Sequence, residues 1–325
     1  MPVRRWYRPP ISGKVTPIPP PPSAGSMTES HLPNARARLA PAGLIFLAIT
    51  SVGWGFNWPV SKYLLTTLPP LTVRGCTGVI GALLLAVLAL TQGQSLKVRR
   101  ELWPRLMLAA LLNVTGWMVL IGLALLWLPA SETALIAYTM PVWAAIIAWP
   151  VLGERPTWLR VMALLLAFAG LAAIMGGNGF TASAAKLPGI LMALTGAIGF
   201  ALGTVLAKKL PLQLPPISAA AWQVGLGCFP VAVAGLLLET THPEALTPFA
   251  WLLLFYSIGI AFCVCYITWF AALARLPASV AAIGTMAVPV IGVIVSAWTL
   301  HEPFGVSQIA ALALTLGGVA LAARS

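Results

Sequence analysis

Ten apolar runs follow one another from residue 41 to residue 323, with only short polar segments between them. A helix needs about 20 apolar residues to cross the hydrocarbon core of a bilayer, where backbone amides must be hydrogen-bonded within the protein. Charged residues make up 8% of the chain, whereas a soluble domain has about 25%. We therefore predict an all-α membrane protein with ten transmembrane helices. The expected helices cover approximately residues 42–65, 70–91, 105–127, 129–150, 156–176, 188–208, 216–238, 248–275, 277–299 and 303–323.

The first 40 residues have a different composition from the rest of the chain. The segment VTPIPPPPSAGS at residues 15–26 is rich in proline and low in complexity. A segment of this kind cannot bury enough apolar surface to fold, so residues 1–40 are predicted to form a disordered tail. The tail has arginines but no apolar stretch of the kind found in a secretory signal peptide, so we do not expect it to be one.

The distribution of basic residues predicts how the chain lies in the membrane. Lysine and arginine accumulate in cytoplasmic loops. If the N-terminus is cytoplasmic, all of the 19 basic residues except Lys62, Arg74 and Lys186 fall on the cytoplasmic side. Both termini are therefore predicted to be cytoplasmic. The net charge of +12 does not indicate a nucleic-acid partner, because the basic residues are scattered between apolar runs instead of forming one patch.

A four-residue motif occurs twice in the chain. Leu-Pro-Ala-Ser at residues 128–131 returns at residues 276–279, and around it residues 128–170 match residues 276–318 at fourteen of 43 positions without a gap. The offset predicts two repeats of five spans each, at residues 41–176 and 188–323. An odd number of spans leaves the second repeat inverted in the membrane. Inverted repeats are typical of transporters that bind a substrate near the middle of the bilayer and open alternately to each side.

Three stretches carry a resemblance to a known family. They are GWGFNWPVSKYLLTTLPPLTVRGC at residues 53–76, LPASETALIAYTMPVWAAIIAWPVLGERPTWLRVMALLLAFAGLAAI at residues 128–174, and the second repeat from residue 188 to residue 322. The chain resembles the EamA repeat of the drug/metabolite transporter superfamily over essentially everything after the tail. One departure is Ala220, which stands where the first repeat has Arg74.

The resemblance implies a fold, a location and an activity. It implies ten helices, with helices 1–4 and 6–9 around a central cavity and helices 5 and 10 at the periphery. Members of the family export amino acids and related metabolites from bacterial cells, including aromatic amino acids, threonine and cysteine-pathway compounds. The resemblance therefore implies a multi-pass protein of the bacterial inner membrane.

Polar and aromatic side chains near the middle of the spans are the candidates for substrate binding, because polar groups in a bilayer are costly. Trp54 and Asn57 share a helix face with Trp58, and Asn113 and Trp117 share another. Packing between helices is the alternative role for each of them. The predicted substrate-binding residues are Trp54, Asn57, Asn113, Trp117, Tyr138, Gln223, Tyr266, Trp269 and Met286.

Prolines and charges at the span ends suggest where a gate could form. Pro141 and Pro289 occupy matching positions, three residues after Tyr138 and Met286, and should bend their helices because proline removes a backbone hydrogen bond. Arg74 is predicted either to pair with Glu132 as an outer gate or to extend toward the membrane surface. We expect the matched glutamates 154 and 302 to stabilise the starts of the helices that follow them.

The predicted function is facilitative export of amino acids or related small metabolites through the central cavity. The central tryptophans and tyrosines favour substrates with large apolar or aromatic side chains. A phosphate-binding loop, an aspartate and an intramembrane histidine are all absent from the sequence, so we expect neither ATP hydrolysis nor an enzyme. No cofactor or metal is expected, and the protein is expected to act as a monomer in the lipid bilayer. A multidrug or nucleoside-type permease of the same fold is the alternative.

Overall fold

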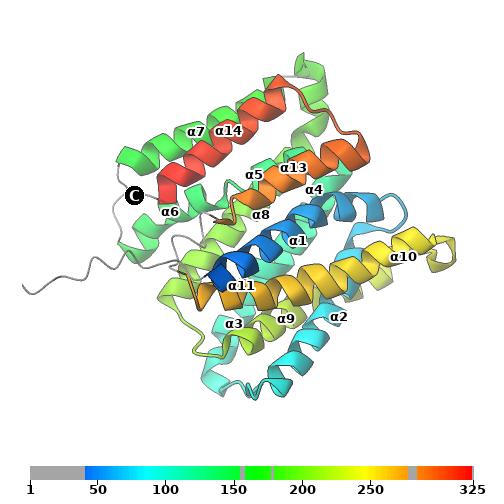
Figure 1. The fold of residues 1–325 in the computed structure, drawn as a ribbon, viewed down its shortest axis with the longest axis vertical. Coiled ribbons are helices and arrows are strands. Elements are labelled where there is room, and N and C mark those ends of the chain that lie inside the picture. Colours follow the sequence, from blue (N-terminus) through cyan, green and yellow to red (C-terminus); the bar gives the residue numbers. More distant parts are fainter. Residues whose placement is uncertain (1–40, 154–157, 177–178, 277–283, 324–325) are drawn as a thin grey trace, which may run out of the picture. The chain divides into compact units, whose positions relative to one another are not determined.

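The computed structural model describes residues 41–153, 158–176, 179–276 and 284–323, and all regular structure in these ranges is helical (Figure 1). The predicted disordered tail at residues 1–40 lies outside the described residues. The first half contains α1 (Pro41–Leu64), α2 (Pro70–Thr91), η1 (Arg100–Leu102), α3 (Trp103–Ala110), η2 (Leu111–Thr115), α4 (Gly116–Trp127), α5 (Ala130–Ala137), α6 (Met140–Leu152) and α7 (Trp158–Gly176). The second half contains α8 (Gly179–Lys209), α9 (Pro216–Leu238), η3 (Pro243–Ala245), α10 (Pro248–Phe255), η4 (Tyr256–Val264), α11 (Cys265–Leu273), α13 (Ala287–Leu300) and α14 (Val306–Ala323). The prediction of an all-α protein is confirmed.

Lipid is the natural solvent for the outside of this bundle. Within the described ranges, seven helices are long and apolar enough to cross a membrane, and two shorter apolar helices cover Ala287–Leu300 and Val306–Gly318. Large apolar side chains point outward, and Leu237, Leu238 and Trp298 are each 78% exposed. Many exposed apolar side chains on apolar helices of this length are typical of a surface that contacts lipid. The number of ten crossings and the cytoplasmic position of both termini stay predictions.

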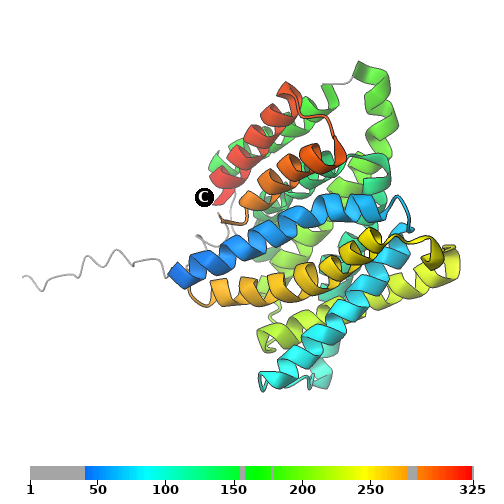
Figure 2. The same ribbon diagram turned by 45° about the vertical axis from the view of Figure 1, so that its right-hand side comes forward.

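Helix packing follows the repeat found in the sequence. α2 packs mainly on α9, and α7 packs mainly on α14, so each of these pairs joins corresponding helices of the two halves. α1 packs on α11 and α13, and α8 packs correspondingly on α4 and on α5 and α6. Exchanging the two halves therefore maps these pairs onto one another. The pair α7 and α14 lies side by side at one edge, away from α2 and α9 (Figure 1; Figure 2).

The predicted bends occur just before the two matching prolines. α5 ends at Ala137 and α6 begins at Met140, so the helix is interrupted at Tyr138 and Thr139 before Pro141. The residues before α13 are also a turn, which ends at Met286 before Pro289. Proline removes a backbone donor, and its ring clashes with the carbonyl group four residues earlier, which explains both interruptions. Their use in gating stays a prediction.

Two segments of π-helix interrupt the third span and its counterpart in the second half. η2 separates α3 from α4, and the longer η4 separates α10 from α11. A π-helical segment widens the helix locally and leaves backbone groups less regularly paired, and such segments occur often at functional sites. The matching positions of η2 and η4 indicate that this feature belongs to both repeats.

The two halves provide acceptors for the starts of each other's helices. The Glu239 carboxylate accepts hydrogen bonds from the Leu71 and Thr72 amides at the start of α2, at 3.0 and 2.8 Å. In the corresponding arrangement, Gln94 Oε1 accepts from two amides at the start of α9, both at 3.2 Å. The first amides of a helix have no acceptor within the helix, so each contact satisfies groups that would otherwise be unpaired in the membrane.

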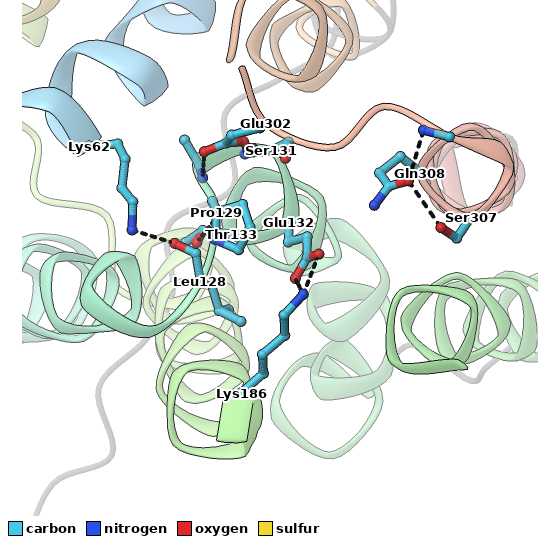
Figure 3. A network of polar contacts seen from close by, with 12 residues as sticks. Lys62, Leu128, Pro129, Ser131, Glu132, Thr133, Lys186, Glu302, Ser307 and Gln308 are labelled. Atoms are coloured by element: carbon cyan, nitrogen blue, oxygen red, sulfur yellow. Dashed lines mark hydrogen bonds and ion pairs between the residues drawn. The ribbon is translucent and has the colours of Figure 1, made fainter. Parts of the chain in front are cut away.

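The contacts of Glu302 correct the prediction that it stabilises the start of the helix that follows it. Its carboxylate accepts from the Ala130 and Ser131 amides at 2.6 and 2.9 Å and from the Ser131 hydroxyl at 2.6 Å (Figure 3). It therefore stabilises the start of α5 in the first half, and not the start of α14, which follows it in sequence. The matched Glu154 lies outside the described residues. The first copy of the repeated Leu-Pro-Ala-Ser motif thus contains the two backbone amides that donate to the Glu302 carboxylate.

Replacing Glu302 with alanine is expected to lower the free energy of unfolding by about 2 kcal/mol, because three hydrogen bonds to a charged group are lost together. Thermal unfolding of the purified protein in detergent measures the change. Glu244→Ala is the matched control, because the Glu244 side chain is 71% exposed and its described side-chain partner is His242 in the polar loop before α10. Equal stability of the two variants would contradict the role of Glu302.

Candidate functional site

A cavity of about 200 Å³ lies between helices of both halves, and it is the candidate functional site. Its wall is formed by side chains from α1, α2, η2, α4, the interruption between α5 and α6, the start of α6, α8, η4 and α11. The residues in the wall are Trp54, Asn57, Trp58, Ser61, Leu64, Val73, Arg74, Thr77, Asn113, Val114, Trp117, Met118, Ile121, Tyr138, Met140, Phe200, Ser257, Ala261, Phe262 and Tyr266. Both π-helical segments contribute to this wall.

The structure brings seven of the predicted site residues into this one cavity. Six are predicted substrate-binding residues and one is a predicted gating residue: Trp54, Asn57, Asn113, Trp117, Tyr138, Tyr266 and Arg74. They are distributed over both repeats, so the cavity forms only when the repeats pack together. Their role in binding a substrate stays a prediction.

Six other predicted residues are outside the cavity wall. They are Gln223, Trp269, Met286, Pro141, Pro289 and Glu132. The Trp269 ring lies 6.0 Å from the Trp54 ring and packs with the buried residues Leu47, Ala272 and Leu276. Trp269 therefore supports a wall residue from behind. Pro141 and Pro289 follow the two helix interruptions at residues 138–139 and 285–286.

Aromatic side chains define the shape of the cavity. The Trp54 and Tyr266 rings meet edge to face with their centroids 5.8 Å apart, and Trp54 Nε1 donates to the Ala261 carbonyl at 3.1 Å. The Trp58 and Tyr138 rings also meet edge to face, at 6.5 Å. Such contacts stabilise aromatic pairs beyond simple burial and hold the rings in fixed orientations. The cavity therefore presents rigid aromatic surfaces on more than one side.

Arg74 is a buried cation in the cavity wall. Its side chain is 9% exposed, and Nε has no hydrogen-bond partner among the described residues. One terminal nitrogen lies 4.0 Å from the sulfur of Met118, which is a weak acceptor. The guanidinium group is therefore poorly satisfied by the protein itself.

The predicted gate pair between Arg74 and Glu132 is not formed. Glu132 is 1% exposed, and its two carboxylate oxygens lie 2.7 and 2.9 Å from Lys186 Nζ on α8 (Figure 3). The physical reason is helix position: α8 packs on α5 and brings Lys186 to the acid, whereas Arg74 on α2 faces the cavity. Lys62, the other cation near this end, donates to the carbonyl oxygens of Leu125 and Leu128.

Several wall residues were not among the sequence predictions. Ser61 lies four residues after Asn57, and Thr77 lies three residues after Arg74, so helical spacing could have identified both. Phe200, Ser257 and Phe262 have no comparable signal, because the sequence does not tell which face of α8 or η4 the neighbouring helices leave open.

The model of the EamA-like transporter family matches residues 41–176 and 187–324, which is most of the chain and both of its halves. This chain belongs to the EamA-like transporter family. The resemblance inferred from sequence motifs is confirmed at the level of the family, and this EamA protein is a multi-pass membrane transporter.

Individual relatives agree with the family. The uncharacterized transporter YvbV of Bacillus subtilis is 34% identical over 292 residues, covering 90% of this chain and 92% of YvbV. The uncharacterized transporter YoaV of the same organism is 27% identical over 281 residues, covering 85% of this chain and 95% of YoaV. A protein of known crystal structure is 21% identical and covers 86% of this chain and 96% of its own, with a TM-score of 0.61, which supports the fold of this EamA chain.

Proposed function

We propose that this EamA transporter exports amino acids or related small metabolites with large apolar or aromatic side chains. The observation that carries the proposal is the cavity between the two repeats, whose wall combines tryptophans, tyrosines and phenylalanines with a few polar groups. Small-molecule sites are concave and mostly apolar, with a small number of polar groups that orient the ligand. An aromatic side chain of a substrate would pair with the wall in the edge-to-face geometry that the wall residues adopt with one another.

The proposed mechanism is alternating access by the two repeats. The wall is shared between repeats, so a relative movement of the two halves would change which side of the membrane the cavity faces. The bends before Pro141 and Pro289 and the π-helical segments η2 and η4 are the places where the helix path is already interrupted. We place the protein in the bacterial inner membrane as a monomer with both termini in the cytoplasm.

Transport is proposed to follow the gradient of the substrate itself. Intramembrane acids and histidines are the usual sites of proton coupling. The buried Glu132 is already paired with Lys186, and the described cavity wall contains neither a carboxylate nor a histidine. Nothing in this wall therefore offers an evident proton acceptor.

Counterflow in proteoliposomes tests the proposed function. Vesicles loaded with unlabelled amino acid, without an ion gradient, are expected to accumulate radiolabelled phenylalanine, tryptophan or leucine more rapidly than serine or glycine. Equal uptake of all five would remove the basis for an aromatic preference. Accumulation of nucleosides or lipophilic drugs with no uptake of amino acids would support the alternative permease instead.

Replacing Tyr138 with alanine is expected to lower this uptake at least about tenfold, because the change removes an aromatic contact surface in the cavity and the edge-to-face pair with Trp58. The matched control is Tyr63→Ala. Tyr63 also meets an aromatic ring, that of Phe249 at 5.2 Å, but it is outside the cavity wall. Uptake by the control should stay within about twofold of the original protein. Equal loss in both variants, with both folded by size-exclusion chromatography, would contradict a binding role for Tyr138.

A further inference from the structure

Arg74 is a buried charge that has no carboxylate partner among the residues that the structure describes. The guanidinium group keeps its proton under all ordinary conditions, so the charge cannot be removed by deprotonation. An unpaired buried charge costs several kcal/mol unless something else neutralises it. Arg74 is 9% exposed, and its described polar contact is with a methionine sulfur. The arrangement is unfavourable for stability alone.

The nearby carboxylates of the described chain have other partners. Glu132 pairs with Lys186, Glu239 binds the amides at the start of α2, and Glu302 binds those at the start of α5. Each of these acids is therefore engaged at a helix end. Among the described residues, none of these acids is available to Arg74, and the cavity is the open space beside its guanidinium group.

The surroundings of Arg74 leave room on the cavity side. Arg74 lies on α2 between Val73 and Thr77, which are also in the wall. On its other side, Arg74 packs against the buried Gly122 of α4, where an added Cβ would lie 3.4 Å from Arg74 Cγ and 3.8 Å from Nε. The α4 side of the arginine is therefore covered by protein, and the cavity is the space from which a ligand can reach the guanidinium group.

We propose, as a step that rests on the proposed function, that Arg74 binds the carboxylate of the transported molecule. The planar guanidinium can donate two parallel hydrogen bonds to a carboxylate, and this geometry is its preferred way of pairing. Arg74 is the one basic residue in the described cavity wall, so the site supplies a single positive charge. That charge matches a monocarboxylate better than a dianionic phosphate. The apolar part of the substrate then lies against Trp58, Tyr138 and Trp117.

A ligand-binding assay that does not depend on transport tests the proposal. The purified full-length protein is heated in detergent with four phenylalanine analogues: phenylalanine, 3-phenylpropionate, phenylalaninamide and phenethylamine. A ligand that binds the folded state raises the unfolding temperature as its concentration exceeds its Kd. The two carboxylates are expected to bind on the order of 10- to 100-fold more tightly than the amide and the amine, which is the usual strength of a hydrogen bond to a charged group.

Variants then assign the preference to Arg74. Arg74→Gln is expected to reduce the preference for carboxylates to less than about threefold, whereas Arg74→Lys should keep the preference with about tenfold weaker binding, because lysine retains the charge but loses the planar fork. Lys62→Gln is the matched control. It removes a cation that lies outside the cavity wall, so the preference should be unchanged. If Arg74→Gln does not fold, Arg74→Lys and the four ligands on the original protein still decide the question.

The outcomes separate this proposal from the proposed function. Equal binding of acid and amide by the original protein, no binding of either acid, or an undiminished preference in Arg74→Gln would overturn the role of Arg74. Counterflow of amino acids could still be observed in each of those cases. Conversely, Arg74-dependent binding of 3-phenylpropionate without any amino-acid counterflow would retain the carboxylate site and reject amino acids as the transported class.

Discussion

Gly75→Leu is expected to abolish the folded protein by forcing α2 away from α9. A Cβ at Gly75 would fall on the backbone of Ala232 and lie 2.7 Å from the carbonyl carbon of Val231. The reciprocal contact is equally close, since a Cβ at Gly235 would lie 2.5 Å from the Thr72 amide nitrogen. Small residues allow membrane helices to pack backbone to backbone, and a larger side chain at such a contact cannot be accommodated by rotamer changes alone. The cost should be about 3 kcal/mol or more.

The same substitution at an open position controls for the change in side chain. Gly199 on α8 has no atom within 4 Å of an added Cβ, so Gly199→Leu should leave the protein folded. Yield of monodisperse protein on size-exclusion chromatography and the midpoint of thermal unfolding measure both variants. If Gly75→Leu were as stable as Gly199→Leu, the close approach of α2 and α9 would be wrong.

Removing one member of the Glu132–Lys186 pair is expected to be more damaging than removing both. Lys186→Met leaves the Glu132 carboxylate, which is 1% exposed, without its partner. Breaking a buried ion pair in this way costs about 3–5 kcal/mol. Glu132→Gln should cost less, because Lys186 is 20% exposed and its ammonium group can extend toward water. The double variant should recover most of the stability of the original protein, since no buried charge is left unpaired.

A double-mutant cycle of thermal unfolding measures this coupling. The control cycle uses the pair His242 and Glu244, whose side chains are 66% and 71% exposed, and its coupling should be near zero. Additive losses in the Glu132 and Lys186 variants would show that the two residues do not depend on each other. Strong coupling would mean that α5 of the first half and α8 of the second half are held together at this end of the bundle.

The cavity wall shows which site residues the sequence could predict and which it could not. Helical spacing placed Trp54, Asn57 and Trp58 on one face, and all three lie in the cavity wall. Position near the middle of a span selected Tyr266 and Trp269, but only Tyr266 reaches the cavity, while Trp269 packs behind Trp54. Spacing tells which residues share a face, and it does not tell which part of that face the neighbouring helices cover.

The amino-acid sequence by itself determined the all-helical membrane fold, the repeat, the family and the two bends before Pro141 and Pro289. Each of these depends on local properties: the length of an apolar run, the spacing of a repeated motif, or the missing backbone N–H of a proline. Only the tertiary structure decided the partners of the charged residues. Glu302 binds the start of α5, Glu132 binds Lys186, and Arg74 lies in a cavity wall whose described residues include no carboxylate. These pairings depend on which helices pack together, because a charge in an apolar bundle takes the partner that its neighbours bring within hydrogen-bond distance.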